Sequence, residues 1–400
     1  METWKKIRLG DACKTNMYSY SPKEKWNFVN YLDTGNITDN KIDSIQYIDV
    51  VNEKLPSRAR RKVKKDSIIY STVRPNQHHF GIIKSQPENF LVSTGFAVID
   101  TDSQVLDADF LYYLLTQSTI VESLNAIAEQ STSAYPSIKP SDIENLEIEI
   151  PDIATQKKIA DVLFSLDKKM AQNMEINKNL EQQAQAIFKA WFIDFEPFDE
   201  KIPANWVVSK LGDIASIKTN SFSPVKNPDA QLEHYSIPAY DEQKYPVFES
   251  AEGVKSNKYI LSKNSVMISK LNPDTKRAWR PMCLSDLAVS STEFIIFEAF
   301  NPAYKDFVFS IIDSAAFSDW MCTHTTGSTN SRQRTTPSAT LEFQIALPDE
   351  KTITDFCAIV TPMYDTISAN ICENQKLAQL RDSILPKLMS GELDVSNIDL

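Results

Sequence analysis

Short apolar or alternating runs, bounded by Pro, Asn and Ser, recur along the chain and predict β-strands. The runs are SIIYSTV from Ser67, FAVID from Phe96, LEIEI from Leu146, SVMIS from Ser265, EFIIF from Glu293 and FQIAL from Phe343. Between them, the segments that begin at Asp107 (DADFLYYLLTQSTIVESLNAIAE) and Asp306 (DFVFSIIDSAAFSDWM) space their apolar residues as helices do. Each half of the chain is therefore predicted to begin as a mixed α/β globule.

Each globule is followed by a segment with the pattern of a long helix. Residues 153–192 contain no Gly or Pro, and their composition favours helix. Within them, one set of positions alternates by four and three, which is the spacing of a coiled-coil seam, and a second set matches it at an offset of 197 residues. The first seam is Leu166, Met170, Asn173, Asn177, Leu180, Ala184, Ile187 and Trp191, and the second is Met363, Ile367, Asn370, Asn374, Leu377, Arg381, Ile384 and Leu388. Two long helices with matching seams are expected to pack on one another.

Four asparagines interrupt the apolar seams at matching positions, Asn173 and Asn177 in the first and Asn370 and Asn374 in the second. A buried asparagine costs stability, but it penalises registers in which it meets Leu instead of another amide. These residues are predicted to form a polar layer that fixes the register of the helices. The alternative is that they face solvent at the edge of the seam. An antiparallel pairing would bring the central asparagines together, whereas a parallel pairing would place both globules at one end.

The first half of the chain returns in the second half as a tandem repeat. Four pairs of similar segments keep their order and spacing: WKKIRLGD at Trp4 and WVVSKLGD at Trp206, DSIIYSTVRP at Asp66 and NSVMISKLNP at Asn264, STGF at Ser93 and STEF at Ser291, and LEIEIPD at Leu146 and FQIALPD at Phe343. The repeat predicts four segments, which are a globule at 1–150, a helical segment at 151–198, a second globule at 199–347 and a second helical segment at 348–400.

Composition narrows the class of protein. A chain of 400 residues exceeds what one hydrophobic core usually organises, so two or three domains are expected. No stretch approaches ~18 consecutive apolar residues, and the start METWKKIRLG has no apolar signal core, so we expect a cytoplasmic protein without a membrane partner. The five cysteines form no C-x-x-C pair, and together with four scattered histidines they show no metal-ligand spacing. Neither a disulfide framework nor a metal site is expected.

The net charge of −11 argues at first against nucleic acid, because neutralising phosphates supplies much of the affinity of DNA-binding proteins. One short segment of the acidic chain is nevertheless strongly basic. Its cations are Arg58, Arg60, Arg61, Lys62, Lys64 and Lys65. The segment is a candidate phosphate-binding edge, and the alternative is a solvated loop.

Two matching loops carry side chains that suit the edges of bases in the major groove. Arginine and lysine suit guanine O6 and N7, and asparagine and glutamine suit adenine N6 and N7. The first loop carries Arg74, Asn76, Gln77, His78 and His79; the second carries Lys270, Asn272, Lys276, Arg277 and Arg280; and a further candidate segment carries Arg332, Gln333 and Arg334. For any single residue, a solvated loop or a phosphate contact is the simpler interpretation. Taken together, the loops favour DNA over a purely structural adaptor.

Motifs for catalysis are weak or missing. The nearest match to the N-P-P-[FY] loop of adenine methyltransferases is Asn301-Pro302-Ala303-Tyr304, which lacks the second proline and precedes a predicted helix. A loose nuclease pattern, Pro228-Asp229 followed by Glu242-Gln243-Lys244, is short and has no counterpart in the first repeat, so surface loops explain it better. The chain also contains no G-x-x-x-x-G-K-[ST] sequence for ATP. Catalysis by this chain alone is not expected.

Two segments make the sequence resemble a known family. QAIFKAWFIDFEPF at 185–198 and LRDSILPKLMSGELDV at 380–395 are similar to the two conserved regions of the specificity subunits of type I restriction-modification enzymes, the HsdS family, and the similar layout covers essentially the whole chain. The resemblance implies an α+β fold with two target-recognition domains in tandem, each followed by a long helix, and an antiparallel coiled coil of the two helices. The basic cluster has no counterpart in the second repeat. The recognition domains differ widely within the family, so the resemblance does not give the bases read.

The resemblance also implies a function. Each recognition domain would read one half of a bipartite site in double-stranded DNA, and the helices would set the spacing and dock two modification subunits, through which restriction subunits join. S-adenosylmethionine, ATP and Mg²⁺ would then belong to the partner chains, which methylate adenine or cleave DNA, and this chain would hold no cofactor and no metal.

Overall fold

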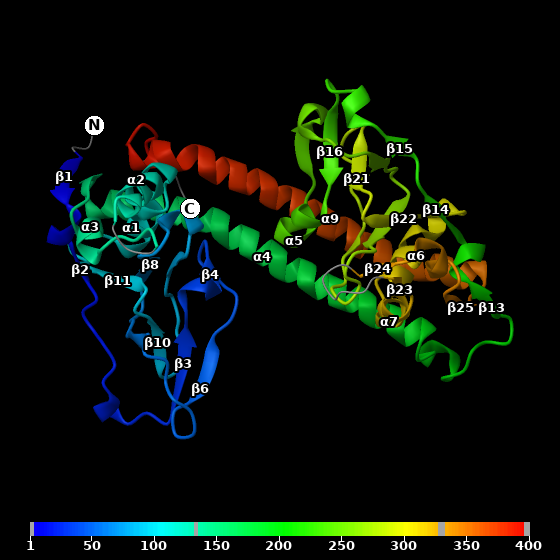
Figure 1. The fold of residues 1–400 in the computed structure, drawn as a ribbon, viewed down its shortest axis with the longest axis horizontal. Coiled ribbons are helices and arrows are strands. Elements are labelled where there is room, and N and C mark those ends of the chain that lie inside the picture. Colours follow the sequence, from blue (N-terminus) through cyan, green and yellow to red (C-terminus); the bar gives the residue numbers. More distant parts are fainter. Residues whose placement is uncertain (1–3, 132–134, 327–332, 396–400) are drawn as a thin grey trace. The chain divides into compact units, whose positions relative to one another are not determined.

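The structure is a computed structural model that describes residues 4–131, 135–326 and 333–395 (Figure 1). The chain forms two compact units. Unit 1 comprises Met1–Lys168 and Leu377–Leu400, and unit 2 comprises Lys169–Lys376. Each unit therefore contains one α/β globule, one part of the first long helix and one part of the second. No helix within the described ranges is both long and apolar enough to cross a membrane.

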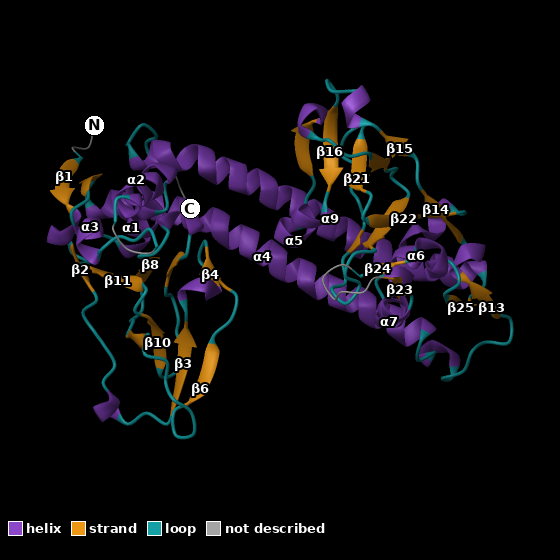
Figure 2. Ribbon diagram, viewed as in Figure 1, coloured by secondary structure: helices purple, strands orange, loops and turns teal. Residues whose placement is uncertain are grey.

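The inner sheet of each globule has four antiparallel strands in the same order. Figure 2 draws the strands of both globules in orange. In unit 1 the order is β2 (Cys13–Thr15), β11 (Phe96–Thr101), β8 (Ile68–Ser71) and β9 (Phe80–Ile82). In unit 2 it is β14 (Ala215–Lys218), β22 (Phe294–Ala299), β19 (Ser265–Ser269) and β20 (Ala278–Trp279). The central strands β8, β11, β19 and β22 are covered on both faces, which explains their almost continuous apolar sequences and confirms four of the predicted strands.

An outer sheet lies beside each inner sheet and was not predicted. Its order in unit 1 is β6 (Gln46–Asp49), β3 (Phe28–Leu32), β10 (Phe90–Ser93) and β7 (Ala59–Arg61). In unit 2 it is β17 (Val247–Ser250), β16 (Gln231–Tyr235), β21 (Ala288–Ser291), β18 (Lys258–Ile260) and β15 (Ser221–Phe222). The central pair is parallel in both units, β3 with β10 and β16 with β21, and its neighbours are antiparallel. The duplication therefore extends to strand topology.

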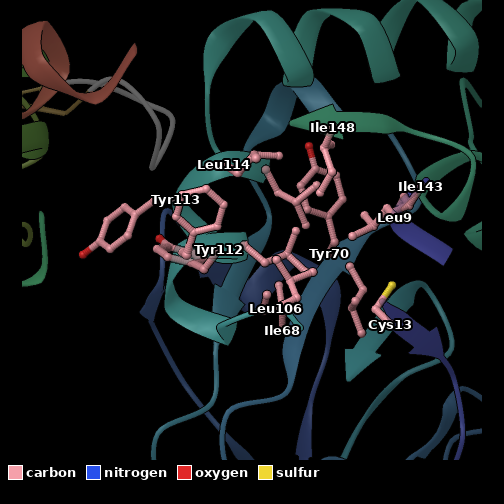
Figure 3. Close-up of a cluster of buried hydrophobic side chains, with 14 of the residues drawn as sticks. Leu9, Cys13, Ile68, Tyr70, Leu106, Tyr112, Tyr113, Leu114, Ile143 and Ile148 are labelled. Atoms are coloured by element: carbon pink, nitrogen blue, oxygen red, sulfur yellow. The ribbon is translucent and has the colours of Figure 1, made fainter. Parts of the chain in front are cut away.

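Both segments with helical spacing fold as pairs of short helices. The pairs are α1 (Ala108–Leu115) with α2 (Ser118–Glu129), and α6 (Lys305–Ile312) with α7 (Ala315–Thr323). In unit 2 the break follows from Ser314, whose hydroxyl accepts a hydrogen bond from the Phe317 amide and caps a new helix. Figure 3 shows side chains of α1 and β8 gathered in the core of unit 1, with Tyr112, Ile68 and Tyr70 among them.

Short elements complete each globule. In unit 1 they are β1 (Lys5–Arg8), β4 (Ile37–Thr38), β5 (Lys41–Ile42), α3 (Pro140–Glu144) and β12 (Glu147–Ile150). In unit 2 they are β13 (Val207–Lys210), α5 (Ile237–Gln243), β23 (Thr325–Thr326), β24 (Arg334–Thr335), α8 (Pro337–Thr340) and β25 (Gln344–Leu347). The pairs β1 with β12 and β13 with β25 bring the start of each repeat to its end, so the predicted strands at Leu146 and Phe343 are confirmed as well.

The repeated Leu-Gly-Asp sequence has a steric reason. A Cβ atom on Gly10 would lie 3.1 Å from Cβ and O of Glu144, and a Cβ atom on Gly212 would lie 3.2 Å from the same atoms of Leu341. Glycine therefore lets the turn after β1 or β13 approach the end of α3 or α8 closely.

The long helices are α4 (Ile153–Phe192) and α9 (Glu350–Met389). In unit 1 the first part of α4 packs on the last part of α9, and the Arg381 guanidinium (Nη1) lies 2.8 Å from the Asp167 carboxylate. In unit 2 the last part of α4 packs on the first part of α9, with the rings of Phe192 and Phe356 centred 4.9 Å apart. The helices are therefore antiparallel, as the family resemblance implied, and α9 begins within the predicted helical segment 348–400.

Near the end of α4 the apolar face is wider than the predicted seam, although the seam residue Trp191 packs on Phe356 of α9, with ring centres 6.1 Å apart. Phe188 and Phe192 are buried there, whereas the predicted seam residues Ile187 and Trp191 are only partly buried. A straight helix of 3.6 residues per turn drifts from a strict 3.5-residue repeat, so the buried stripe moves around the helix. The stripe also follows the globule, because Phe192 packs on Phe307 of α6 as well as on α9.

Candidate nucleic-acid interface

In unit 1 the backbone of the loop after β8 is held by hydrogen bonds from a serine side chain and from a neighbouring segment. The Ser71 hydroxyl donates to the carbonyl of Val73 at 2.9 Å and accepts from its amide at 3.2 Å. The Arg74 amide donates to the Pro136 carbonyl at 3.0 Å. The next residues form a short 3-10 turn, Pro75–Gln77, so this loop presents its side chains from a defined backbone.

Unit 2 repeats this construction bond for bond. The Ser269 hydroxyl donates to the Leu271 carbonyl at 3.1 Å and accepts from its amide at 3.2 Å. The Asn272 amide donates to the Gln333 carbonyl at 2.9 Å. Arg74 and Asn272 also share the left-handed backbone conformation, with φ of +48° and +49°. The two loops therefore have one scaffold and different side chains.

The candidate residues of the first loop divide into two groups. Arg74, Asn76 and Gln77 are exposed. The histidines instead hold neighbouring structure, because His78 Nδ1 lies 3.0 Å from Asp39 Oδ1 and His79 Nδ1 lies 2.6 Å from the Ile37 carbonyl oxygen. Both of these partners belong to the small hairpin of β4 and β5.

Most cations of the second loop are paired with carboxylates inside unit 2. The ion pairs are Lys276 with Asp313 at 2.8 Å, Arg277 with Asp241 at 2.6 Å, Arg280 with Asp306 at 2.7 Å and Asp365 at 2.9 Å, and Arg334 with Glu293 at 2.9 Å. The hydrogen bond to Asp241 raises the pKa of Arg277. These four residues have structural partners. Among the described residues, Lys270 and Asn272 of the second loop and Gln333 of the further candidate segment have no carboxylate partner. Arg332 lies outside the described residues.

The basic cluster lies on and around the edge strand β7 of unit 1. Arg58, Arg60, Lys64 and Lys65 are exposed, and Lys64 lies 3.8 Å from Asp100. Arg61 is half-buried, which lowers its pKa. Lys62 forms an ion pair with Glu24 and lies 5.1 Å from the centre of the Trp26 ring. Three exposed cations, Arg58, Arg60 and Lys65, thus form no ion pair among the described residues, and Lys64 is exposed but paired with Asp100.

One turn connects the basic cluster with the first loop. The Thr94 amide donates to the Arg58 carbonyl at 2.8 Å, and the Thr72 amide donates to the Gly95 carbonyl at 2.8 Å. The sequence did not reveal this connection, because Arg58 and Thr72 are joined only through a turn that follows β10. Exposed cations and the loop thus adjoin one another on unit 1.

The four asparagines of the helix pair meet in unit 2. The Asn173 amide donates to Asn374 Oδ1 at 2.8 Å and to Glu373 Oε2 at 2.7 Å, and the Asn370 amide donates to Asn177 Oδ1 at 2.8 Å. Asn173 and Asn177 are buried, so the solvent-facing alternative does not describe them. Their role in setting the helix register remains a prediction.

The weak catalytic motifs have structural explanations. Asn301 caps the turn Pro302–Tyr304, accepting a hydrogen bond from the Ala303 amide at 3.1 Å. Lys244 of the nuclease-like pattern binds the Glu181 carboxylate at 2.8 Å. Across the described ranges, no group of three or more His, Cys, Asp or Glu residues could hold a metal ion.

The chain is similar to known proteins over its first 182 residues and along nearly its whole length. A family model for the type I restriction modification DNA specificity domain matches residues 1–182. That match covers 182 of the 400 residues. The chain is 26% identical over 438 aligned residues to the type I restriction enzyme MjaIX specificity subunit of Methanocaldococcus jannaschii, a match that covers 98% of the chain and 94% of the relative.

Two further similarities differ in kind. The type I restriction enzyme HindI specificity subunit of Haemophilus influenzae is 35% identical over 205 residues, and the match covers 51% of this chain and 44% of that relative. The chain thus matches less than half the length of the HindI protein. The crystal structure of a type I restriction-modification system S subunit from M. genitalium matches with a TM-score of 0.60 at 16% identity, covering 97% of this chain and 96% of that one. That likeness supports the fold.

Proposed function

We propose that this chain is a specificity subunit of a type I restriction-modification enzyme and reads a bipartite site in double-stranded DNA, one half with the loops of each unit. The observation that carries the proposal is the duplicated loop, whose hydrogen-bonded scaffold is the same in both units while its side chains differ. Such a scaffold can present different base-reading groups in the same geometry, and sequence is read by side chains at base edges.

The negative charge of the chain favours a complex in which partner chains supply some of the contacts to DNA phosphates. A protein of net charge −11 is poorly suited to bind DNA by phosphate contacts alone. The exposed cations Arg58, Arg60, Lys64 and Lys65 supply a local contact on unit 1. Further phosphate contacts would come from the modification subunits, while the loops supply specificity.

The helix pair is proposed to set the spacing and to dock two modification subunits. A helix of 40 residues at ~1.5 Å per residue is roughly 60 Å long, which exceeds one DNA turn of ~34 Å. Large apolar side chains point to solvent on α4 and α9, including Phe164, Met174, Ile176 and Leu380, which are 45%, 51%, 45% and 47% exposed. Exposed apolar residues of this kind are typical of surfaces that bind another protein.

In this proposal the partner subunits carry out the methylation and the cleavage of DNA. In this proposal the modification subunits carry S-adenosylmethionine and methylate adenine, and restriction subunits that join through them carry ATP and Mg²⁺. The specificity subunit binds DNA and holds no cofactor. Its ion pairs and asparagines stabilise the fold without reacting.

The test is to purify the chain alone and together with its modification subunit, and to map methylated adenines in DNA exposed to each preparation. The complex should methylate a motif of two short half-sites separated by unspecified bases, and the chain alone should neither methylate nor cleave DNA. Methyl transfer by the chain alone, or an uninterrupted motif from the complex, would contradict the proposal.

A further inference from the structure

We infer that Arg74 reads a guanine in the half-site bound by unit 1, an inference that rests on the proposed function. The first observation is the backbone of Arg74, which has φ +48° and ψ +69°. This left-handed region favours glycine, and other residues that occupy it store strain, which occurs most often at functional sites. Asn272, at the same place in unit 2, has φ +49°. Both repeats therefore keep a side chain where glycine would be unstrained.

The second observation is that the loop fixes where this side chain starts. The Arg74 amide is bound to the Pro136 carbonyl at 3.0 Å, and Val73 forms an isolated β-bridge with Ser137. Because two consecutive residues, Val73 and Arg74, are tied to neighbouring backbone, the position of the Arg74 Cβ is restricted. A fixed starting point lowers the entropy lost when a long side chain binds a base.

The third observation concerns the guanidinium. It is exposed and lies 5.4 Å from the centre of the Tyr135 ring, a contact that orients its plane. Among the described residues Arg74 forms no ion pair, in contrast to Arg277 and Arg280 of the second loop, which are held by Asp241 and Asp306. The planar donors of Arg74 thus remain available to a ligand.

The chemistry of the donors selects the base. An arginine fork donates two parallel hydrogen bonds, and guanine is the base that offers two acceptors, O6 and N7, in the major groove. Asn76 and Gln77 are exposed two and three residues further on and suit an adjacent base pair. Asn272 presents an amide from the same backbone position, so the same reading is not expected in the half-site of unit 2.

The experiment uses the complex with its modification subunit and a library of duplexes in which each base pair of the motif is varied. The wild-type motif should contain a G·C pair in the half-site of unit 1. Arg74→Gln should lose the preference for that pair by roughly 10- to 100-fold and leave the other half-site unchanged, while Arg74→Lys should keep part of the preference. Competition binding with the same library gives the preference even where methylation is too slow to measure.

A matched control is Arg60→Ala, which removes an exposed cation from the edge strand of the same unit. It should weaken binding to all duplexes alike and lower the slope of log affinity against log salt by about one. If Arg74→Gln behaves like Arg60→Ala, or if the half-site of unit 1 contains no guanine, the inference is wrong although the proposed function stands. If the wild-type complex recognises no bipartite site, the proposed function itself fails.

Discussion

Both repeats place an aspartate in the first turn of the helix that follows the inner sheet, and they pair it differently. In unit 1 Asp109 binds Lys84 at 2.6 Å, and the two side chains are 31% and 40% exposed. In unit 2 Asp306 binds Arg280 at 2.7 Å, and the side chains are 4% and 15% exposed. The Thr361 hydroxyl of α9 also donates to Asp306, at 2.7 Å. The same position thus carries a surface ion pair in one repeat and a buried network in the other.

The difference extends to the loops that are candidates for DNA. Unit 1 leaves Arg58, Arg60 and Arg74 exposed, whereas unit 2 binds Arg277 and Arg280 to carboxylates. A basic residue in a matching loop is therefore not evidence of DNA binding by itself. Its partners decide whether it stabilises the fold or remains available to a ligand.

The largest expected effect on stability comes from removing the cations that pair with Asp306 and Asp109. Arg280→Ala leaves Asp306 buried without its cation, and removing one partner of a buried pair costs about 3 kcal/mol of unfolding free energy. The matched variant Lys84→Ala removes a half-exposed partner and should cost less than about 1 kcal/mol. Urea unfolding, with hydrogen exchange to assign the change to one unit, measures both. Equal costs would show that burial does not separate the two pairs.

The asparagines offer a smaller comparison between equivalent positions. Asn173 is fully buried and its amide donates two hydrogen bonds, whereas Asn370 is half-buried and its amide donates one. Asn173→Ala should lower the free energy of unfolding by about 2 kcal/mol and Asn370→Ala should lower it by about 1 kcal/mol. The difference arises because a buried polar group that loses its hydrogen-bond partner is more costly than a half-buried one. The exposed Asn179→Ala is the control and should change the free energy of unfolding little. A larger cost at Asn370 would mean that the repeats do not differ as the structure indicates.

The smallest expected effect depends on pH. Burial, followed by the charge of Arg280, lowers the pKa of Lys305 from 10.5 to about 8. The folded state therefore binds this proton more weakly than the unfolded state does, so the group opposes folding below pH 8 and the penalty disappears as pH rises from 8 to 10.5. Lys305→Met should raise stability at pH 7 by about 1 kcal/mol, since the lost hydrogen bond to the Lys263 carbonyl offsets part of the gain.

The measurement is urea unfolding of both proteins between pH 7 and 10. The stability advantage of the methionine variant should shrink across this range. If the methionine variant were more stable than the wild type by the same amount at every pH, the charge on Lys305 would not destabilise the folded state. The first repeat has Ala108 at the equivalent position, so no such pH dependence is expected there.

The sequence predicted those parts of the fold whose pattern is local. The apolar runs at Ile68 and Val266 are strands buried on both faces, and the helix at 153–192 was predicted at its observed bounds. The outer sheets were missed, because strands such as FVNYL at Phe28 mix polar and apolar residues and depend on partners far along the chain. The drift of the seam at Phe188 was missed for a similar reason, since the globule determines which face is buried.

In the candidate site, too, the sequence does not predict contacts between residues that lie far apart along the chain. Residue type and loop position identified Arg74 and Arg280 equally. Only the folded chain brings Tyr135 beside the first and Asp306 beside the second. Nothing local in the sequence distinguishes these partners, because each lies more than twenty residues away from the arginine that it contacts.

Exchange of one globule tests the central claim, that each unit reads its own half-site, most directly. Residues 20–145 would be replaced by the equivalent region of a known type I specificity subunit, and methylated adenines would be mapped in DNA exposed to the assembled complex. The account predicts that one half of the motif changes to that of the donor while the other half and the spacer are kept. A change in both halves, or an unchanged motif from an active complex, would contradict it.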